Sequence, residues 1–142
     1  MKRHTRNFYF IMATPFLLQN IMTKEVISVS PNMPLMEAGK IMARHKFNGL
    51  PIVDADNKLL GIVTEYDIIS KSFLPIEQRG DLNIITVREV MNHDPLALEE
   101  NASFDEVVAA FRDHHSVNPI PVVDKDRHVM GVVSRLDILK GL

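Results

Sequence analysis

The chain has 142 residues, of which 46% are hydrophobic and 24% are charged. This length suits one compact domain or two small units that share a core, and the composition argues against a disordered or collagen-like chain. The formal net charge of −2 argues against nucleic acid as the main partner, and the lack of cysteine excludes disulfides and thiolate metal sites.

Residues 1–19 are predicted to form an N-terminal extension. An apolar run at residues 8–18 follows four basic residues: Lys2, Arg3, His4 and Arg6. This pattern superficially resembles a signal peptide, but Thr14 and Pro15 interrupt the run and no small-residue cleavage pattern follows. The run is also too short to span a bilayer. We therefore expect a cytoplasmic protein with no membrane partner, with Met12 as an alternative start. Four side chains of the extension are expected to pack onto the body: Phe8, Phe10, Phe16 and Leu17.

The next segment predicts a strand, a helix, two strands and a second helix. Residues 26–29 read as a short strand, and residues 35–46 as a helix in which Leu35, Ala38, Met42 and His45 recur at helical spacing. Pro34 stands at the capping position, which weakens the start of this helix. Residues 51–53 and 59–63 predict strands around a polar turn, and a second helix begins after Thr64.

A connector and a second series of elements follow. Residues 73–86 contain a proline and a glycine and read as a linker, which ends in a capping box formed by Thr86 and Glu89. Strands are then predicted at 96–98, 120–123 and 129–133. A helix begins at the Ser103–Glu106 capping box, and another begins after Ser134. The first of these two helices carries an apolar stripe: Phe104, Val107, Val108 and Phe111.

The two series are copies of one another. Residues 48–69 (NGLPIVDADNKLLGIVTEYDII) and 118–139 (NPIPVVDKDRHVMGVVSRLDIL) are identical at nine of 22 positions, where composition alone gives roughly one or two. Upstream, residues 21–42 match residues 90–111 at an offset of 69 instead of 70. The sequence therefore predicts two pseudo-symmetric repeats, at residues 20–72 and 87–142.

Each repeat has the order β-α-β-β-α, which predicts an α/β (α+β) fold. The strands containing Gly-Ile-Val and Gly-Val-Val are apolar on both faces, so other parts of the protein must cover both faces of the sheet. We expect the two repeats to pack through their sheets, with helices outside.

These motifs resemble a tandem pair of cystathionine-β-synthase (CBS) domains, the Bateman module, here free-standing. The resemblance rests on residues 50–54 and 61–67 and on their twins at 120–124 and 131–137, and it covers about residues 20–142. It implies a non-catalytic regulatory fold whose clefts bind AMP, ADP, ATP or S-adenosylmethionine, with no further cofactor. It also implies a homodimer that acts on a separate, unidentified protein.

Two alcohol–acid pairs are the candidate ligand-binding groups. Asp67 and Asp137 each follow a hydroxyl residue, Thr64 and Ser134, by three positions at a predicted helix start. A carboxylate offers two acceptor oxygens for a ribose diol, and the hydroxyl with the free amides of the first helical turn suits a phosphate. The same spacing is also a helix capping box, which needs no ligand.

The residues around the two pairs differ. Glu65 follows the first hydroxyl and repels phosphate, whereas Arg135 follows the second and can bind phosphate in a bidentate way. We therefore expect the second cleft to prefer phosphorylated ligands, although Arg135 can equally be a solvated surface charge.

Two further pairs complete the predicted clefts. The prolines Pro51 and Pro121 are expected to line the adenine. Asn48 and Asn118 precede these prolines by three residues. In the family a polar or basic side chain at this place can reach the phosphate, but both asparagines also fit turns that use local side-chain bonds.

Other chemistries find little support. The adjacent His114 and His115 diverge on a helix and cannot both face one ion. The Asp-x-Asp pairs at 54–56 and 124–126 recur in both turns and indicate hairpin chemistry. No nucleophile, base or metal set supports an enzyme. The alternative function is a ligand-free dimerisation module whose clefts have decayed.

Overall fold

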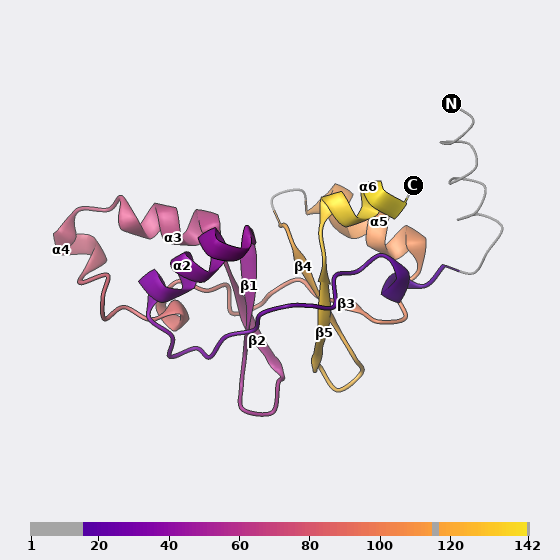
Figure 1. Cartoon of the computed structure of the whole chain (residues 1–142), viewed down its shortest axis with the longest axis horizontal. Coiled ribbons are helices and arrows are strands. Elements are labelled where there is room, and N and C mark those ends of the chain that lie inside the picture. The colour runs from indigo at the N-terminus through magenta and orange to yellow at the C-terminus, as the bar shows by residue number, and fades with distance from the viewer. Residues whose placement is uncertain (1–15, 115–116, 142) are drawn as a thin grey trace. The chain divides into compact units, whose positions relative to one another are not determined.

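The computed structural model describes residues 16–114 and 117–141 (Figure 1). The described residues form two compact units. The first unit combines residues of the ranges 16–25, 96–125 and 130–141, and the second combines 26–95 and 126–129. Both units mix helices with strands, which confirms the predicted α/β (α+β) class.

The sheet of the second unit has two antiparallel strands. β1 (Gly49–Val53) pairs with β2 (Leu59–Thr64), so that Leu50 lies opposite Val63 and Ile52 lies opposite Gly61. β1 carries apolar side chains on both faces and is buried along nearly its whole length. The structure thus confirms the strands predicted at 51–53 and 59–63.

Helices cover the core of this unit. α2 (Leu35–His45) forms because Leu35, Ala38 and Met42 recur at helical spacing, and all three are buried. It ends where Lys46 adopts the left-handed conformation, with φ of 58°. α3 (Glu65–Ser72) follows β2 directly. The predicted linker contains a short helix, α4 (Ile76–Arg79), and the 3₁₀ turn η2 (Val87–Glu89) follows it.

The sheet of the first unit has three strands in the order β3-β4-β5. These are β3 (Leu98–Glu99), β4 (Ile120–Val123) and β5 (Val129–Val133), and β3 runs parallel to β4. The helical elements are η1 (Leu18–Asn20), α5 (Phe104–Asp113) and α6 (Arg135–Gly141). Val107 and Phe111 of α5 join the buried sheet residues in the core.

The strands predicted at the start of each repeat are shorter than expected. Residues 26–29 contribute a single bridge, in which Val29 donates to the Pro51 carbonyl and accepts from Val53 N–H. A parallel ladder that continued back to Ile27 would need an N–H group from Pro51, and proline has none. Pro121 stops β3 in the same way, so it covers 98–99 instead of 96–98.

The start of the first repeat, around Thr23, packs in the unit that contains most of the second repeat. Thr23 N–H donates to the Val132 carbonyl at 2.8 Å, and Val132 N–H donates back to the Thr23 carbonyl at 3.0 Å. Gly131 permits this approach because a Cβ there would lie 2.5 Å from the Thr23 carbonyl oxygen. The glycine of the Gly-Val-Val motif is therefore needed for close contact between backbones.

The start of the second repeat, around Asn92, packs in the unit that contains most of the first repeat. Asn92 and Ile62 exchange two backbone hydrogen bonds, of 2.9 and 3.2 Å. A Cβ at Gly61 would lie 2.6 Å from the Asn92 carbonyl oxygen. Each compact unit therefore holds residues from both repeats, and the repeat boundaries at 20–72 and 87–142 stay a prediction about the sequence.

The described end of the N-terminal extension is partly packed. The Phe16 ring meets the Phe104 ring edge-on, with centroids 5.5 Å apart, and Leu18 is only 1% exposed. Leu17 is 55% exposed, so its predicted packing is wrong. The predictions for Phe8, Phe10 and Met12 lie outside the described residues. Within residues 16–114 and 117–141, no helix is long and apolar enough to cross a membrane.

Candidate functional site

The Thr64–Asp67 pair lies where β2 passes into α3. The Thr64 hydroxyl accepts Asp67 N–H at 3.3 Å and donates to Asp67 Oδ2 at 2.9 Å. Asp67 Oδ2 also accepts Thr64 N–H at 2.8 Å, which completes the capping box. In the described part of the chain, Asp67 Oδ1 makes no hydrogen bond. The pair therefore caps the helix and still has one carboxylate oxygen with acceptor capacity.

The Ser134–Asp137 pair has the same place between β5 and α6. Ser134 N–H donates to Asp137 Oδ2 at 2.9 Å, and Asp137 N–H donates to the Ser134 hydroxyl at 3.1 Å. Both pairs are thus capping boxes, as the spacing predicts. Capping does not exclude ligand binding, because a carboxylate can accept about four hydrogen bonds.

Asp137 has one more partner, which the sequence analysis missed. The Thr23 hydroxyl lies 3.3 Å from Asp137 Oδ1 and 3.2 Å from Oδ2, although the two residues are 114 positions apart. The only signal in the sequence is a polar residue at matched positions of the two repeats, Thr23 and Asn92. Nothing in that pattern shows which carboxylate it would reach.

Asn48 and Asn118 each accept the first N–H group of the following repeat helix, but they use different atoms. The Asn118 side-chain oxygen accepts Arg135 N–H at 3.1 Å, at the first residue of α6. In the other repeat the Asn48 backbone carbonyl accepts Glu65 N–H at 2.9 Å, which leaves the exposed Asn48 side chain out of this bond. The Asn118 bond is not the predicted local side-chain bond, because its partner lies 17 residues further along the chain.

The remaining residues of the predicted clefts fall into an exposed charged pair and a buried proline pair. Glu65 and Arg135 are both exposed at the first position of α3 and α6. Pro51 and Pro121 lie within β1 and β4, and both are fully buried. The predicted contact of the two prolines with adenine stays a prediction.

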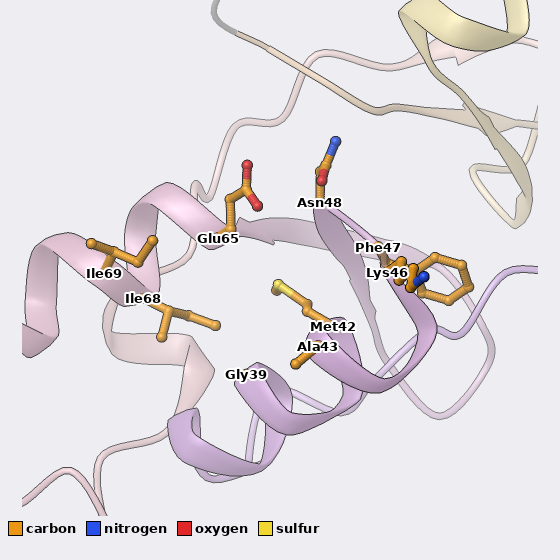
Figure 2. Close-up of a pocket in the computed structure, with 9 residues that line it drawn as sticks. All are labelled: Gly39, Met42, Ala43, Lys46, Phe47, Asn48, Glu65, Ile68 and Ile69. Atoms are coloured by element: carbon orange, nitrogen blue, oxygen red, sulfur yellow. The ribbon is translucent and has the colours of Figure 1, made fainter.

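A groove of about 380 Å³ lies between α2 and α3 of the second unit (Figure 2). Met42 of α2 and Ile68 of α3 point toward its centre, and Glu65 and Asn48 project at one end. Its floor is apolar and lacks a hydroxyl or carboxylate pair. Of the residues considered for the predicted clefts, Asn48 and Glu65 line this groove.

A second cleft of about 460 Å³ lies in the same unit. Its polar lining comes from the segment 28–32, from Asp54 after β1 and from Arg88 of η2. Asp54 and Thr64 are at opposite ends of the β1–β2 hairpin, because Gly49 pairs with Thr64 and Val53 with Leu59. This cleft contains none of the predicted site residues.

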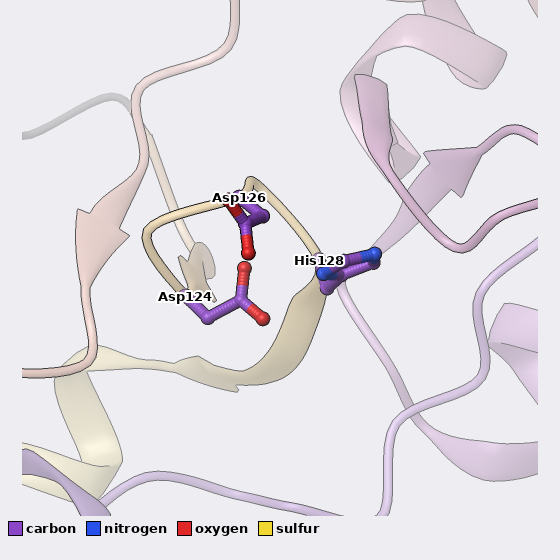
Figure 3. A group of neighbouring side chains, drawn as sticks. All are labelled: Asp124, Asp126 and His128. Carbon is purple, nitrogen blue, oxygen red and sulfur yellow. The ribbon is translucent and has the colours of Figure 1, made fainter.

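The turn after β4 gathers three potential metal ligands. The ligand atoms of Asp124, Asp126 and His128 lie within 4.8 Å of one another (Figure 3). In the equivalent turn after β1, Asp54 Oδ1 accepts the N–H groups two and four residues later, each at 2.9 Å. Lys58 occupies the position of the histidine there. Because the same Asp-x-Asp spacing forms that turn with a lysine, turn geometry accounts for the cluster.

Comparisons with known proteins agree with the repeated architecture. The family model of the CBS domain matches residues 18–73 and 87–142. The chain is 35% identical over 122 residues to an L-aspartate semialdehyde sulfurtransferase from Methanocaldococcus jannaschii, which covers 86% of this chain and 22% of that protein. The chain thus spans about a fifth of the length of the curated relatives it matches first.

Solved structures of similar chains cover nearly the whole fold. The CBS domain pair of protein MJ0100, in complex with 5′-methylthioadenosine and S-adenosyl-L-methionine, is 33% identical with a TM-score of 0.75, covering 89% of this chain and 95% of that chain. CBSX2 in complex with AMP is 21% identical with a TM-score of 0.77, covering 88% and 94%, and shares the fold. Two repeats, two equivalent alcohol–acid helix starts and two family matches lead to one assignment: this chain belongs to the CBS domain family and contains a tandem CBS pair.

Proposed function

We propose that this chain is a non-catalytic regulatory module that binds adenosine-containing ligands and acts in trans on another protein. The ligands are AMP, ADP, ATP or S-adenosylmethionine, and the ribose-binding groups are Asp67 and Asp137. Thr64 and Ser134, with the amides of the following helical turn, contribute to the binding of phosphate.

The observation that carries this proposal is the repeated helix start. Each repeat places a hydroxyl and a carboxylate in the same hydrogen-bonded geometry at a strand-to-helix junction. Asp67 keeps one oxygen without a hydrogen bond to the described residues, so it can accept from a ribose diol without losing its cap. The 33% identical CBS pair that holds two adenosyl compounds supports the same ligand class.

The two sites should differ in the charge of the ligand that they prefer. Arg135 at the first position of α6 favours a phosphorylated ligand, whereas Glu65 at the first position of α3 disfavours it. We expect Arg135→Ala to weaken binding of AMP at the Asp137 site more than binding of uncharged 5′-methylthioadenosine.

The chain should also form homodimers. Tyr66 and Ile69 on α3, and their equivalents Leu136 and Leu139 on α6, are all more than half exposed. Phe73, which follows α3, is 84% exposed. Apolar side chains at spacing i, i+3 and i+7 form a stripe that a second copy can cover. Sedimentation equilibrium on the wild type and on Ile69→Glu checks this: a monomeric wild type contradicts it.

The same stripe favours a second candidate function. If both capping boxes serve only the helices, the module is a ligand-free dimerisation unit. In that case the oligomer forms, but no adenosyl compound raises the melting temperature.

Calorimetric titration separates the two functions. Wild-type protein is titrated with AMP, ADP, ATP, S-adenosylmethionine and 5′-methylthioadenosine, and then compared with Asp67→Asn, Asp137→Asn and the double variant. Asparagine keeps an oxygen for the capping N–H group but removes the charge, so the helices should remain intact. We expect each single variant to lose about tenfold or more in affinity at its own site, because hydrogen bonds to a charged group are lost.

Glu89→Gln is the matched control. Thr86 and Glu89 form a capping box of the same type at η2, outside the repeat helices, with Thr86 N–H donating to Glu89 at 3.0 Å. This variant should bind every ligand as the wild type does. Unchanged affinity in the Asp67→Asn, Asp137→Asn double variant would remove the assignment of the two carboxylates.

A further inference from the structure

The cleft of about 460 Å³ in the second unit is lined by charges of both signs, and we call it the Arg88 cleft. Its volume lies within the range of small-molecule sites in proteins. Arg88 of η2 lines it together with Asp54, which follows β1. In the described part of the chain, neither side chain has an ion-pair partner. Two opposite charges therefore line one cleft without neutralising each other.

The Asp54 carboxylate is oriented by its own turn. Its Oδ1 atom accepts the N–H groups of Asp56 and Lys58, each at 2.9 Å. Its Oδ2 atom makes no hydrogen bond to the described residues. The side chain is half-buried, so solvent and salt screen its charge less than that of a fully exposed carboxylate. Asp54 thus offers one oriented oxygen to a cationic group in the cleft.

Hydrogen-bond donors line another part of the same cleft. Arg88 is anchored through its backbone, whose N–H group donates to the Pro31 carbonyl at 3.2 Å, while its guanidinium makes no hydrogen bond to the described residues. The Ser30 hydroxyl accepts Asn32 N–H at 3.2 Å, and its own hydrogen has no acceptor among the described residues. A guanidinium and a hydroxyl are donors that suit a carboxylate.

The other repeat does not carry this set of side chains. At the offset of 69, Ser28 and Ser30 correspond to Ala97 and Glu99. Arg88 of η2 corresponds at the same offset to Gln19 of η1. The equivalent positions thus lose the cation and both hydroxyls and gain an acid. Because both repeats form the same elements, the fold itself does not require the side chains of the Arg88 cleft.

We propose that the Arg88 cleft binds a free α-amino acid with an apolar side chain. Asp54 repels a simple anion and Arg88 repels a simple cation, whereas a zwitterion is attracted by both. The α-carboxylate can accept two hydrogen bonds from the guanidinium, and the α-ammonium can donate to Asp54 Oδ2. Val53 and Leu60, both half-buried, supply apolar lining for the side chain.

This inference goes beyond the function proposed above and does not depend on it. Neither alcohol–acid pair lines the Arg88 cleft. An amino acid here would be a second signal to the module, in addition to the adenosyl ligand.

The test is an NMR titration of the ¹⁵N-labelled wild-type chain with L-leucine and two analogues that keep its side chain. L-leucinamide lacks the carboxylate, and 4-methylpentanoate lacks the ammonium group. We expect leucine at about 10 mM to shift the amide signals of residues 28–32, 54 and 88, and each analogue to bind at least about tenfold more weakly. This comparison uses the wild type alone, so it does not depend on the folding of a variant.

Two variants remove one charge each. Arg88→Gln and Asp54→Asn should weaken leucine binding by about tenfold or more, because each loses hydrogen bonds assisted by a charge. Asparagine keeps an oxygen for the two N–H groups of the turn. Arg44→Gln and Asp56→Asn are the matched controls, since both side chains are exposed and neither lines the cleft. The controls should bind leucine as the wild type does.

The outcomes are distinct. Equal binding of leucine and either analogue overturns the assignment of a zwitterion. Absence of shifts at about 10 mM leucine, or shifts confined to the groove between α2 and α3, overturns the site. AMP is titrated into a second sample of the same protein, so that a failure of leucine to bind is distinguished from a failure of the proposed function.

Discussion

Replacement of Gly61 by alanine should strongly destabilise the second unit. The added Cβ would lie 2.6 Å from the Asn92 carbonyl oxygen and 2.9 Å from Met91 Sδ, and the first of these is backbone that cannot rotate away. Relief requires the bridge between Ile62 and Asn92 to open, at about 1 kcal/mol for each of its two hydrogen bonds. Overpacking adds about 1–3 kcal/mol.

The expected total is about 3–5 kcal/mol of unfolding free energy, which corresponds to a melting temperature lower by about 10–20 °C for a chain of this size. Circular dichroism on thermal unfolding measures this shift. Gly39→Ala is the matched control, because a Cβ there would meet only Ile68 side-chain atoms at 3.8 Å. Alanine in the interior of α2 should raise stability by about 0.5–1 kcal/mol. If Gly61→Ala melted at or above the wild-type temperature, the close-approach reasoning would be wrong.

Two further pairs of variants test local contacts. Asn118→Ala removes the oxygen that accepts the first N–H group of α6 and should lower the free energy of unfolding by about 1 kcal/mol. Asn48→Ala should change the free energy of unfolding by no more than about 0.5 kcal/mol, because the Asn48 backbone carbonyl accepts the equivalent N–H group of α3 and is kept in the variant. Urea unfolding compares them, and equal losses would contradict the assignment. Phe16→Ala should cost about 1–2 kcal/mol because the half-buried ring loses its edge contact, while Leu17→Ala should be nearly neutral. A larger loss for Leu17→Ala would refute this.

The hairpins and helix starts could be predicted from the sequence because their signals are local. The strands at 120–123 and 129–133 are present as predicted. Each is a short apolar run bounded by a polar turn, and this local pattern is sufficient to predict where the strand lies. The Thr64 and Thr86 capping boxes are also confirmed, since hydroxyl and acid lie three residues apart. These features depend on neighbours within one turn of the chain.

The features that the sequence did not reveal depend on contacts between distant segments. The strand at 26–29 shrinks to one bridge because Pro51, on the partner strand, lacks the N–H group that the ladder needs. The contact between Thr23 and Asp137 depends on a backbone approach that only Gly131 makes possible. A repeat shows that two segments are equivalent, but not which segment each one touches.

The start of each repeat packs in the unit that contains most of the other repeat, and this arrangement affects the order of folding during synthesis. Residues 16–25 leave the ribosome before residues 96–125 and 130–141, which supply the rest of the first unit in the described part of the chain. We expect this early segment to wait, unpaired, until the last strand emerges, whereas residues 26–95 already contain most of their own unit. Protease protection of stalled nascent chains would show residues 16–25 protected only after residues 130–141 have emerged, and protection when synthesis has reached only residue 95 would contradict this order.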